Sequence, residues 1–254
     1  MDRNYYSQHG EDYILSEMLK GQTTGCFVEI GCIDGRRFSN TLTFEESGWN
    51  GVCVEAHSDY IPLLKANRPG AEICHCAVSD RDLDAVTFYA NKRGSLSTLN
   101  PSKENEFKSR FGRWFTGFET QTIPQLCLNT IFERYHIHNP DILSIDVEGE
   151  EALVLAGLDL IHHHPRIMVI EADSIQDEKK LDARLIPAGY VKSVRLVNNL
   201  FYVLDSSLEN SLFNRDHHGM LIHTQHPLDS DGDQFVPFRY CFRQKSCHHL
   251  GVPD

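Results

Sequence analysis

Short apolar runs alternate with segments of helical periodicity through about four-fifths of the chain. This alternation is typical of buried strands that form a mostly parallel sheet with helices on both faces. The predicted strands span residues 26–30, 51–55, 72–78, 142–147 and 167–171, and residues 86–90 are predicted as an added short strand. The predicted helices span residues 40–47, 59–67, 124–135, 150–156 and 181–188. The pattern therefore predicts an α/β fold built on a doubly wound, mostly parallel sheet.

Two regions depart from this regular alternation. Residues 191–197 and 200–204 form two apolar runs around Asn198-Asn199, which predicts an antiparallel strand pair that closes the sheet. Residues 91–122 mix glycines with aromatic residues, which predicts either a partly helical insertion near the substrate or a packed surface loop. The pattern fades after Asp205, so we expect one domain over residues 1–205, with an N-terminal cap helix within 1–24, and an extension of unknown role over 206–254.

Composition narrows the classes of partner. The formal net charge of -12 disfavours a phosphate backbone, so no nucleic acid is expected. No apolar run approaches the roughly 20 residues that span a bilayer, and the N-terminus lacks the apolar core of a signal peptide. None of the eight cysteines forms a C-x-x-C pair. We therefore expect a cytoplasmic protein with reduced thiols and no membrane span.

The motif VEIGCIDG, residues 28–35, carries a hydrophobic strand directly into glycines. Gly31 and Gly35 allow a turn in which the backbone approaches a ligand at the carboxyl edge of the sheet. The spacing is E-x-G-x-x-x-G, and the middle glycine of the dinucleotide-binding motif is missing. The acidic Glu29 therefore favours a ligand with a cationic amino group over one with a pyrophosphate.

The second predicted strand ends in Glu55. A carboxylate at this place, about 20 residues beyond the glycine turn, can accept hydrogen bonds from both hydroxyls of a ribose. An ordinary carboxylate at the end of a strand has the same appearance in sequence. Together the two motifs predict a nucleoside-containing cofactor, and they do not separate S-adenosylmethionine from a nicotinamide cofactor.

A third motif, SIDVEGEE over residues 144–151, supplies carboxylates at the end of the fourth strand. Asp146 and Glu148 directly follow an apolar strand, and Glu171 ends the next one. The acidic residues at 150–151 are explained equally well as partners of a helix dipole. Because close carboxylates repel one another, such a cluster raises the pKa of one of its members or attracts a cation.

These motifs stand in the order found in FkbM-type methyltransferases, which the chain resembles over residues 6–205. The resemblance is carried by YSQHGEDYIL (6–15), FVEIGCIDGRRFSNT (27–41), SGWNGVCVEA (47–56), AVSDRD (77–82), ILSIDVEGEEALVLAG (142–157) and IMVIEAD (167–173). It implies a class I Rossmann-like fold and methylation of hydroxyls on sugars, glycolipids or polyketide-type natural products. Ile33 departs from the family, in which a polar residue is more usual between the glycines.

The resemblance also implies roles for individual residues. The methionine part of the cofactor would lie near Glu29, Gly31, Gly35 and Asn40, the ribose near Glu55, and the adenine near Val78, Ser79 and Asp80. Asp146 and Glu148 would face the reacting centre. Ser7, Gln8, Glu11 and Asp12 would cap the pocket, with a plain helix cap as the alternative role for Ser7.

The implied reaction transfers a methyl group from S-adenosylmethionine to a hydroxyl oxygen of a small-molecule or glycan acceptor. An alcohol is a weak nucleophile and requires a base, for which Asp146 is the first candidate and Glu148 or Glu171 the second. A divalent cation held by Asp146 and Glu171 is an alternative way to acidify the hydroxyl. Two other classes stay open at this point: a nicotinamide-dependent oxidoreductase, and a cofactor-binding domain without catalysis.

Overall fold

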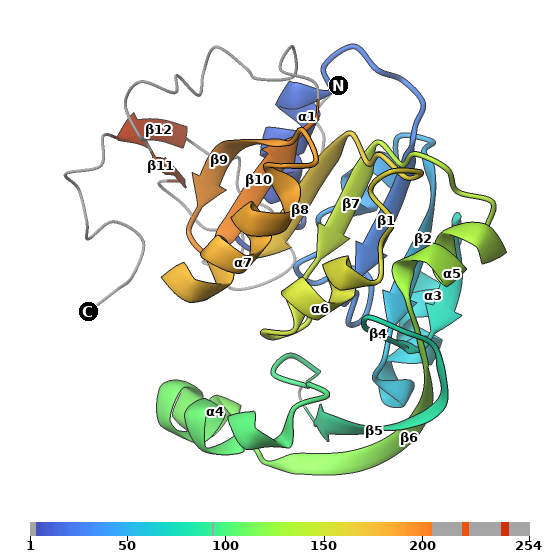
Figure 1. Cartoon of the computed structure of the whole chain (residues 1–254), viewed down its shortest axis with the longest axis vertical. Coiled ribbons are helices and arrows are strands. Elements are labelled where there is room, and N and C mark those ends of the chain that lie inside the picture. The colour runs from blue at the N-terminus through green and yellow to red at the C-terminus, as the bar shows by residue number, and fades with distance from the viewer. Residues whose placement is uncertain (1–3, 93, 205–219, 224–239, 244–254) are drawn as a thin grey trace.

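The computed structural model describes residues 4–92, 94–204, 220–223 and 240–243 (Figure 1). Its main element is a seven-stranded sheet with the strand order β3-β2-β1-β7-β8-β10-β9. These strands are β1 (Cys26–Ile30), β2 (Asn50–Glu55), β3 (Ala71–His75), β7 (Ile142–Ile145), β8 (Ile167–Glu171), β9 (Val191–Leu196) and β10 (Asn199–Val203). The first five pair in parallel, and β10 is antiparallel to both of its neighbours. The predicted doubly wound, mostly parallel sheet is confirmed.

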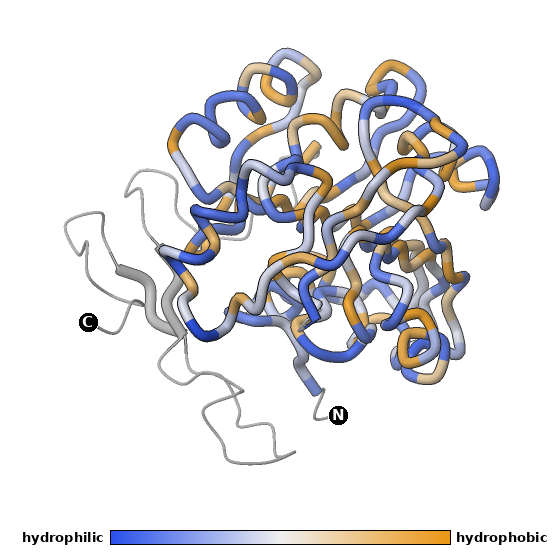
Figure 2. The backbone as a smooth tube through the Cα atoms, turned by 90° about the horizontal axis from the view of Figure 1, so that it is seen from below, coloured by the Kyte–Doolittle hydropathy of each residue, from blue (hydrophilic) through white to orange (hydrophobic). Residues whose placement is uncertain are grey.

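Helices cover both faces of this sheet. One face carries α1 (Glu11–Met18), α2 (Leu42–Glu45) and α3 (Ile61–Asn67, preceded by the 3-10 turn η1 at Ser58–Tyr60), and the other carries α5 (Leu128–Arg134), α6 (Glu151–Ala156) and α7 (Ile175–Leu185). Side chains of β1 alternate between the two cores: Phe27 packs toward the first set of helices, and Val28 and Ile30 toward the second. Hydrophobic and hydrophilic positions alternate along the helical segments, as expected for helices with one buried side (Figure 2).

A second, three-stranded sheet branches from the first. The predicted strand over 72–78 ends at His75, and β4 (Ala77–Val78) pairs instead with β6 (Phe118–Leu126), which pairs with β5 (Leu83–Asn91). The predicted helix over 124–135 is wrong at its start, since residues up to Leu126 belong to β6. The spacing of apolar residues in this segment fits a helix as well as a strand. Because β6 pairs with β5 over most of its length, the segment forms a strand.

The segment between β5 and β6 forms a partly helical insertion with a core of its own. It contains η2 (Pro101–Lys103), α4 (Glu104–Phe111) and η3 (Gly112–Trp114). Leu96, Phe107 and Phe115 are its buried residues, and Phe111 and Phe118 pack against them. In Figure 1 the long β5–β6 ribbon carries α4 at its end, away from the strands of the large sheet.

The chain after Leu185 closes the sheet as an antiparallel pair, as predicted. The turn lies one residue earlier than expected, at Val197 and Asn198, and Val197 has a φ of 53°. Beyond it, β11 (Met220–His223) pairs with β12 (Tyr240–Arg243), and the rest of the 206–254 extension lies outside the described residues. Among the helices that the structure describes, none has the length and apolar character needed to cross a membrane.

Candidate active site

A large cavity of about 1110 Å³ opens at the carboxyl ends of β1, β2, β7 and β8. This edge is the usual ligand position in a doubly wound sheet. The insertion contributes a facing wall that includes Leu96, Arg110, Phe111 and Trp114. Because a pocket for one small ligand measures roughly 300–1,000 Å³, the cavity has room for a cofactor together with a small acceptor.

Glu55 marks one end of the cavity. Its carboxylate accepts hydrogen bonds from the backbone N–H of Ile33 (2.6 Å) and of His57 (2.7 Å), one on each oxygen. Burial raises the pKa of Glu55 to about 7. The two backbone donors fix the direction of the carboxylate, which remains part of the cavity wall. It can therefore accept further hydrogen bonds from hydroxyl groups of a ligand.

Next to Glu55 the cavity wall is apolar. The residues that line it are Cys76, Ala77, Val78 and Phe88. Ala77 and Phe88 also belong to a small hydrophobic core formed by the strands of the small sheet. Of the residues predicted to border an adenine, Val78 is in this wall, and Ser79 and Asp80 are not among the lining residues. An apolar wall of this kind suits the face of a flat ring.

The two glycines of the first motif are explained by close packing within the protein. Gly31 has a φ of 88°, and a Cβ there would lie 1.9 Å from the carbonyl oxygen of Asp146. Gly35 has a φ of 79°, and a Cβ there would meet the side chains of Leu64 and Arg68. Gly31 lines the cavity, and Gly35 lies outside the lining. The close approach at Gly31 allows β1 and β7 to end side by side at the cavity floor.

Glu29 lines the cavity and is also the centre of a buried polar network. Its carboxylate accepts hydrogen bonds from the hydroxyls of Ser39 (2.9 Å) and Thr41 (2.7 Å) and from the backbone N–H of Asn40 (2.6 Å). Arg68 donates to the same carboxylate at 2.9 Å. Glu29 therefore orders the loop over residues 39–41, in addition to the cofactor contact predicted for it.

Two further partners complete this network. Arg68 also pairs with Glu45, and the Arg68 side chain is fully buried. The Asn40 amide, on the cavity side, donates to the Ser144 hydroxyl at 2.9 Å. The sequence gives no sign of Arg68, because nothing in the residues around it separates a buried arginine from a surface one at the end of a helix.

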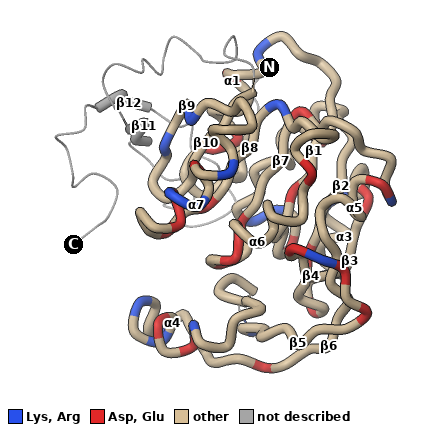
Figure 3. The backbone as a smooth tube through the Cα atoms, in the orientation of Figure 1, with Lys and Arg blue, Asp and Glu red and all other residues tan. Residues whose placement is uncertain are grey.

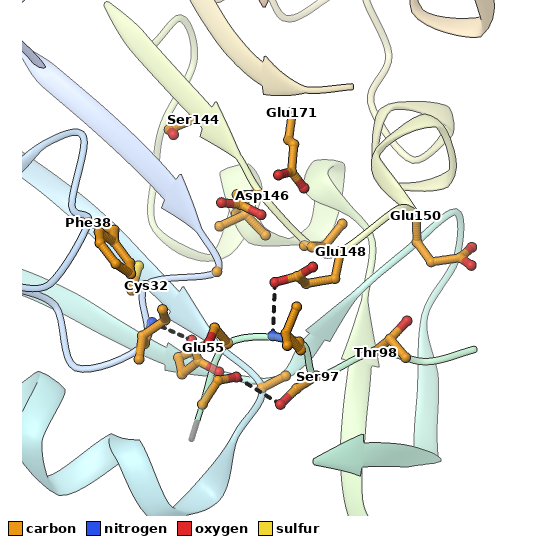
Figure 4. A pocket seen from close by; sticks show the side chains of 18 of the residues that line it. Cys32, Phe38, Glu55, Ser97, Thr98, Ser144, Asp146, Glu148, Glu150 and Glu171 are labelled. Atoms are coloured by element: carbon orange, nitrogen blue, oxygen red, sulfur yellow. Dashed lines mark hydrogen bonds between the residues drawn. The ribbon is translucent and has the colours of Figure 1, made fainter. Parts of the chain in front are cut away.

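Four carboxylates gather at the ends of β7 and β8, as Figure 4 shows for Asp146, Glu148 and Glu171. Oxygen atoms of Asp146, Glu171 and Glu151 all lie within 4.8 Å of one another. Glu148 has a φ of 59° and accepts a hydrogen bond from the backbone N–H of Leu96 at 2.8 Å. Acidic positions also mark the backbone close to α6 in Figure 3. The structure thus brings together the three residues predicted for the reacting centre.

Crowding and burial raise the pKa values of this cluster. Asp146 is exposed to the cavity, yet the surrounding walls withdraw it from bulk water and raise its pKa to about 7, with repulsion from Glu151 adding to the rise. Burial, followed by repulsion from Asp146, raises the pKa of Glu148 to about 8. The pKa of Glu171 is raised for the same two reasons. Carboxyl groups in this state can exchange protons near neutral pH.

Glu151 is the member of the cluster that the sequence did not reveal. It is buried and accepts hydrogen bonds from the backbone N–H groups of Val147 (3.1 Å) and Gly149 (2.9 Å). Its place at the start of α6 also fits the helix-dipole explanation. Position in sequence therefore could not distinguish a dipole partner from a member of the site.

The carboxylate donor set is also suitable for a hard divalent cation, which prefers oxygen ligands. Asp146, Glu151 and Glu171 each offer one oxygen within the distances given above. One oxygen of Glu151 is already engaged by two backbone N–H groups, and Asn198 donates to Glu171. These hydrogen bonds from backbone and side-chain donors of the protein hold Glu151 and Glu171 in place.

Three polar contacts join the insertion to carboxylates of the main domain. One is the Leu96–Glu148 hydrogen bond, and a second runs from the Asn100 amide to Glu150 at 3.1 Å. The third is a two-pronged ion pair between Arg110 and Asp173, at 2.5 and 3.0 Å. The insertion is thereby held over the carboxylate cluster as a roof.

The N-terminal segment approaches the site at two neighbouring residues. Gln8 and His9 line the cavity, and Ser7, Glu11 and Asp12 are buried behind them. The Ser7 hydroxyl donates to Asp12 at 2.6 Å and accepts from the backbone N–H of Gly10 at 3.0 Å, at the start of α1. Glu11 accepts from the Asn199 amide at 2.7 Å and so ties α1 to β10. Three of the four residues thus hold the segment in place beneath Gln8.

The strand order defines an α/β domain with a ligand-sized cavity at the carboxyl ends of its parallel strands, and comparison with known proteins gives the family. The profile of the methyltransferase FkbM domain matches residues 26–212. The chain therefore belongs to the FkbM methyltransferase domain family. This membership favours methyl transfer with S-adenosylmethionine over the nicotinamide-dependent alternative. No curated protein matches the chain.

Solved structures with a similar arrangement are distant. A precorrin-6Y C5,15-methyltransferase from Geobacter metallireducens GS-15 has a TM-score of 0.42 and 10% identity, over 76% of this chain and 85% of that one. A TehB-like SAM-dependent methyltransferase from Corynebacterium glutamicum ATCC 13032 Kitasato has a TM-score of 0.39 and 10% identity, over 77% and 85%.

Proposed function

We propose that this methyltransferase transfers a methyl group to a hydroxyl oxygen of a sugar, glycoconjugate or polyketide-type small molecule. The observation that carries the proposal is a cluster of carboxylates with raised pKa values. This cluster lines the same cavity as Glu55. An alcohol acceptor requires a base, and a carboxylate with a pKa near the working pH suits that task. Such a cluster has no clear use in methyl transfer to an atom that carries no proton.

The lining residues fit S-adenosylmethionine from one end of the cavity to the other. Glu55 would hold the ribose hydroxyls, and the apolar wall at Val78 would cover the adenine. Gly31 and Asn40 line the same cavity and would contact the methionine part. Gly35, Ser79 and Asp80 would support these contacts from behind the wall.

When bound, the cofactor supplies a methyl group on a positively charged sulfur. The cavity holds the acceptor against it, and placing the two reactants in line provides much of the acceleration. Asp146 would accept the hydroxyl proton, with Glu148 or Glu171 as the second candidate for this role. A divalent cation held by Asp146 and Glu171 is the alternative means of acidifying the hydroxyl.

Replacing Glu55 tests the cofactor placement. Glu55→Gln keeps the size of the side chain and removes its charge, so the affinity for S-adenosylmethionine is expected to fall by ~1–3 kcal/mol, or roughly 5- to 150-fold. Isothermal titration calorimetry measures this loss. The control is Glu72→Gln, which removes an exposed carboxylate from β3. Equal affinities of the two variants would remove Glu55 from the site.

The pH profile tests the role of the cluster. If ionised Asp146 is the base, turnover falls about tenfold per pH unit below its pKa of about 7 and levels off above it. Because the negative charge of Glu151 raises that pKa, Glu151→Gln is expected to lower it and to move the acidic limb to lower pH. Glu133→Gln, at an exposed position of α5, is the control. If the acidic limb of the pH profile did not shift in Glu151→Gln, a proton shared among the carboxylates of the cluster would be contradicted.

A further inference from the structure

Two thiols lie in contact at the junction between the two sheets. The sulfur atoms of Cys74 and Cys76 are 3.5 Å apart, and both residues are buried. Cys74 lies near the end of β3. Cys76 lies between β3 and β4, where the chain passes from the large sheet to the small one. Because residues two apart on an extended chain project to the same face, both sulfurs point into the core beside α5.

The surroundings of this pair favour a reactive thiolate. The hydrogen bond from Cys76 lowers the pKa of Cys74, and Tyr135 and Arg134 lower it further. Cys76 keeps its proton, because the same contact and its burial raise its pKa. A thiolate beside a cationic side chain and a second thiol is the arrangement of cysteines that oxidise readily and then close a disulfide.

Cys76 connects the pair to the cavity, and Cys74 lies directly behind it. Cys76 lines the cavity wall next to Ala77 and Val78, the wall assigned above to the adenine. Cys32 also lines the cavity, but burial raises the pKa of its thiol. Cys32 is therefore an internal control that lines the same cavity as Cys76 and has a less reactive thiol.

We propose that Cys74 and Cys76 form an oxidation site at which a small peroxide closes a reversible disulfide beside the cofactor wall. The Cys74 thiolate attacks one peroxide oxygen, the O–O bond breaks, and a sulfenic acid forms as hydroxide leaves. The Cys76 sulfur then displaces the sulfenic oxygen as water and forms the S–S bond. In sum, two thiols and one hydrogen peroxide give one disulfide and two waters.

Closing this bond moves the cavity wall. A disulfide measures about 2.05 Å, so the two sulfurs must approach by roughly 1.5 Å. A ring closed over three residues strains the backbone at Cys76, directly before Ala77 and Val78. Strained disulfides are easily reduced, which makes the change reversible by a thiol. This effect on cofactor binding rests on the proposed adenine position, and disulfide formation itself does not.

The test treats the full-length protein with hydrogen peroxide, with and without S-adenosylmethionine, and maps the cysteines by mass spectrometry. The peptide that contains Cys74 and Cys76 is expected to lose two hydrogen atoms and to regain them with dithiothreitol, while Cys32 stays reduced. In Cys76→Ser, Cys74 is expected to stop at the sulfenic acid, which a dimedone probe captures. Cys26→Ser, at a half-buried cysteine outside the pair, is expected to behave as wild type.

Three results would overturn the proposal: an unchanged Cys74–Cys76 peptide, oxidation of Cys32 at the same rate, or capture of no sulfenic acid in a folded Cys76→Ser protein. Cofactor affinity of the oxidised protein is expected to fall about tenfold or more and to recover after reduction. A disulfide that forms at the same rate with the cofactor present supports the oxidation site and contradicts the adenine position instead.

Discussion

Asp146→Asn is expected to bind S-adenosylmethionine with nearly wild-type affinity and to turn over at about one hundredth of the wild-type rate or less. The substitution keeps the size of the side chain and removes the group that would accept the hydroxyl proton. Asp146 is exposed to the cavity, so the change leaves no buried charge without a partner. Calorimetry gives the affinity, and release of S-adenosylhomocysteine with a hydroxylated acceptor gives the rate.

Chelation separates the two roles open to Asp146. A base needs no metal, so turnover of the wild type is expected to persist in EDTA. Loss of turnover with recovery on Mg²⁺ or Mn²⁺ would instead support a cation held by Asp146 and Glu171. A folded Asp146→Asn protein with near-normal turnover would contradict both roles, and it would favour a cofactor-binding domain in which the carboxylates are structural.

Arg68→Met is expected to lower the free energy of unfolding by ~3–5 kcal/mol. The Arg68 side chain is fully buried between Glu29 and Glu45, whose own side chains are 5% and 7% exposed. Removing the cation leaves two buried carboxylates without their partner, and the loop over 39–41 loses the donor that links it to α3. Chemical denaturation monitored by circular dichroism measures the loss.

A surface ion pair provides the matched control for Arg68. Arg166 donates to Asp141 at 2.7 Å, but its side chain is 37% exposed. Arg166→Met is therefore expected to cost no more than about 1 kcal/mol. Adding Glu29→Gln and Glu45→Gln to Arg68→Met should recover part of the lost stability, because no uncompensated charge then remains. A loss for Arg68→Met equal to that for Arg166→Met would show that the buried network contributes little.

The large sheet could be predicted because its strands are continuous apolar runs that end in turn or acidic residues. The runs at 26–30 and 167–171 match β1 and β8 residue for residue. Parallel strands buried on both faces carry this signal directly in their composition. The carboxylates of the site could be predicted for the same reason, since Asp146 and Glu171 each follow such a run at the edge where the strands end.

The small sheet could not be predicted in the same way. Only part of β6 is buried, so its apolar residues are spaced in a manner that also fits a helix. Its partner β5 lies across the whole insertion, and a pairing at that distance leaves no local signal. The network around Glu29 is hidden for a related reason, because Arg68 becomes its partner through tertiary packing alone.

The β5–β6 ribbon has a consequence for how acceptor choice can change. The chain leaves the main domain at Leu83 and returns opposite it at Gln125, two positions that face each other in the ribbon. Residues between these points can lengthen, shorten or be exchanged without altering the register of any strand in the large sheet. The part of this ribbon that roofs Asp146 and Glu148, residues 94–117, is thus a module that varies separately from the cavity wall at Glu55, Val78 and Phe88. Members of such a fold can diversify in the molecules they accept while their methyl-transfer chemistry stays the same.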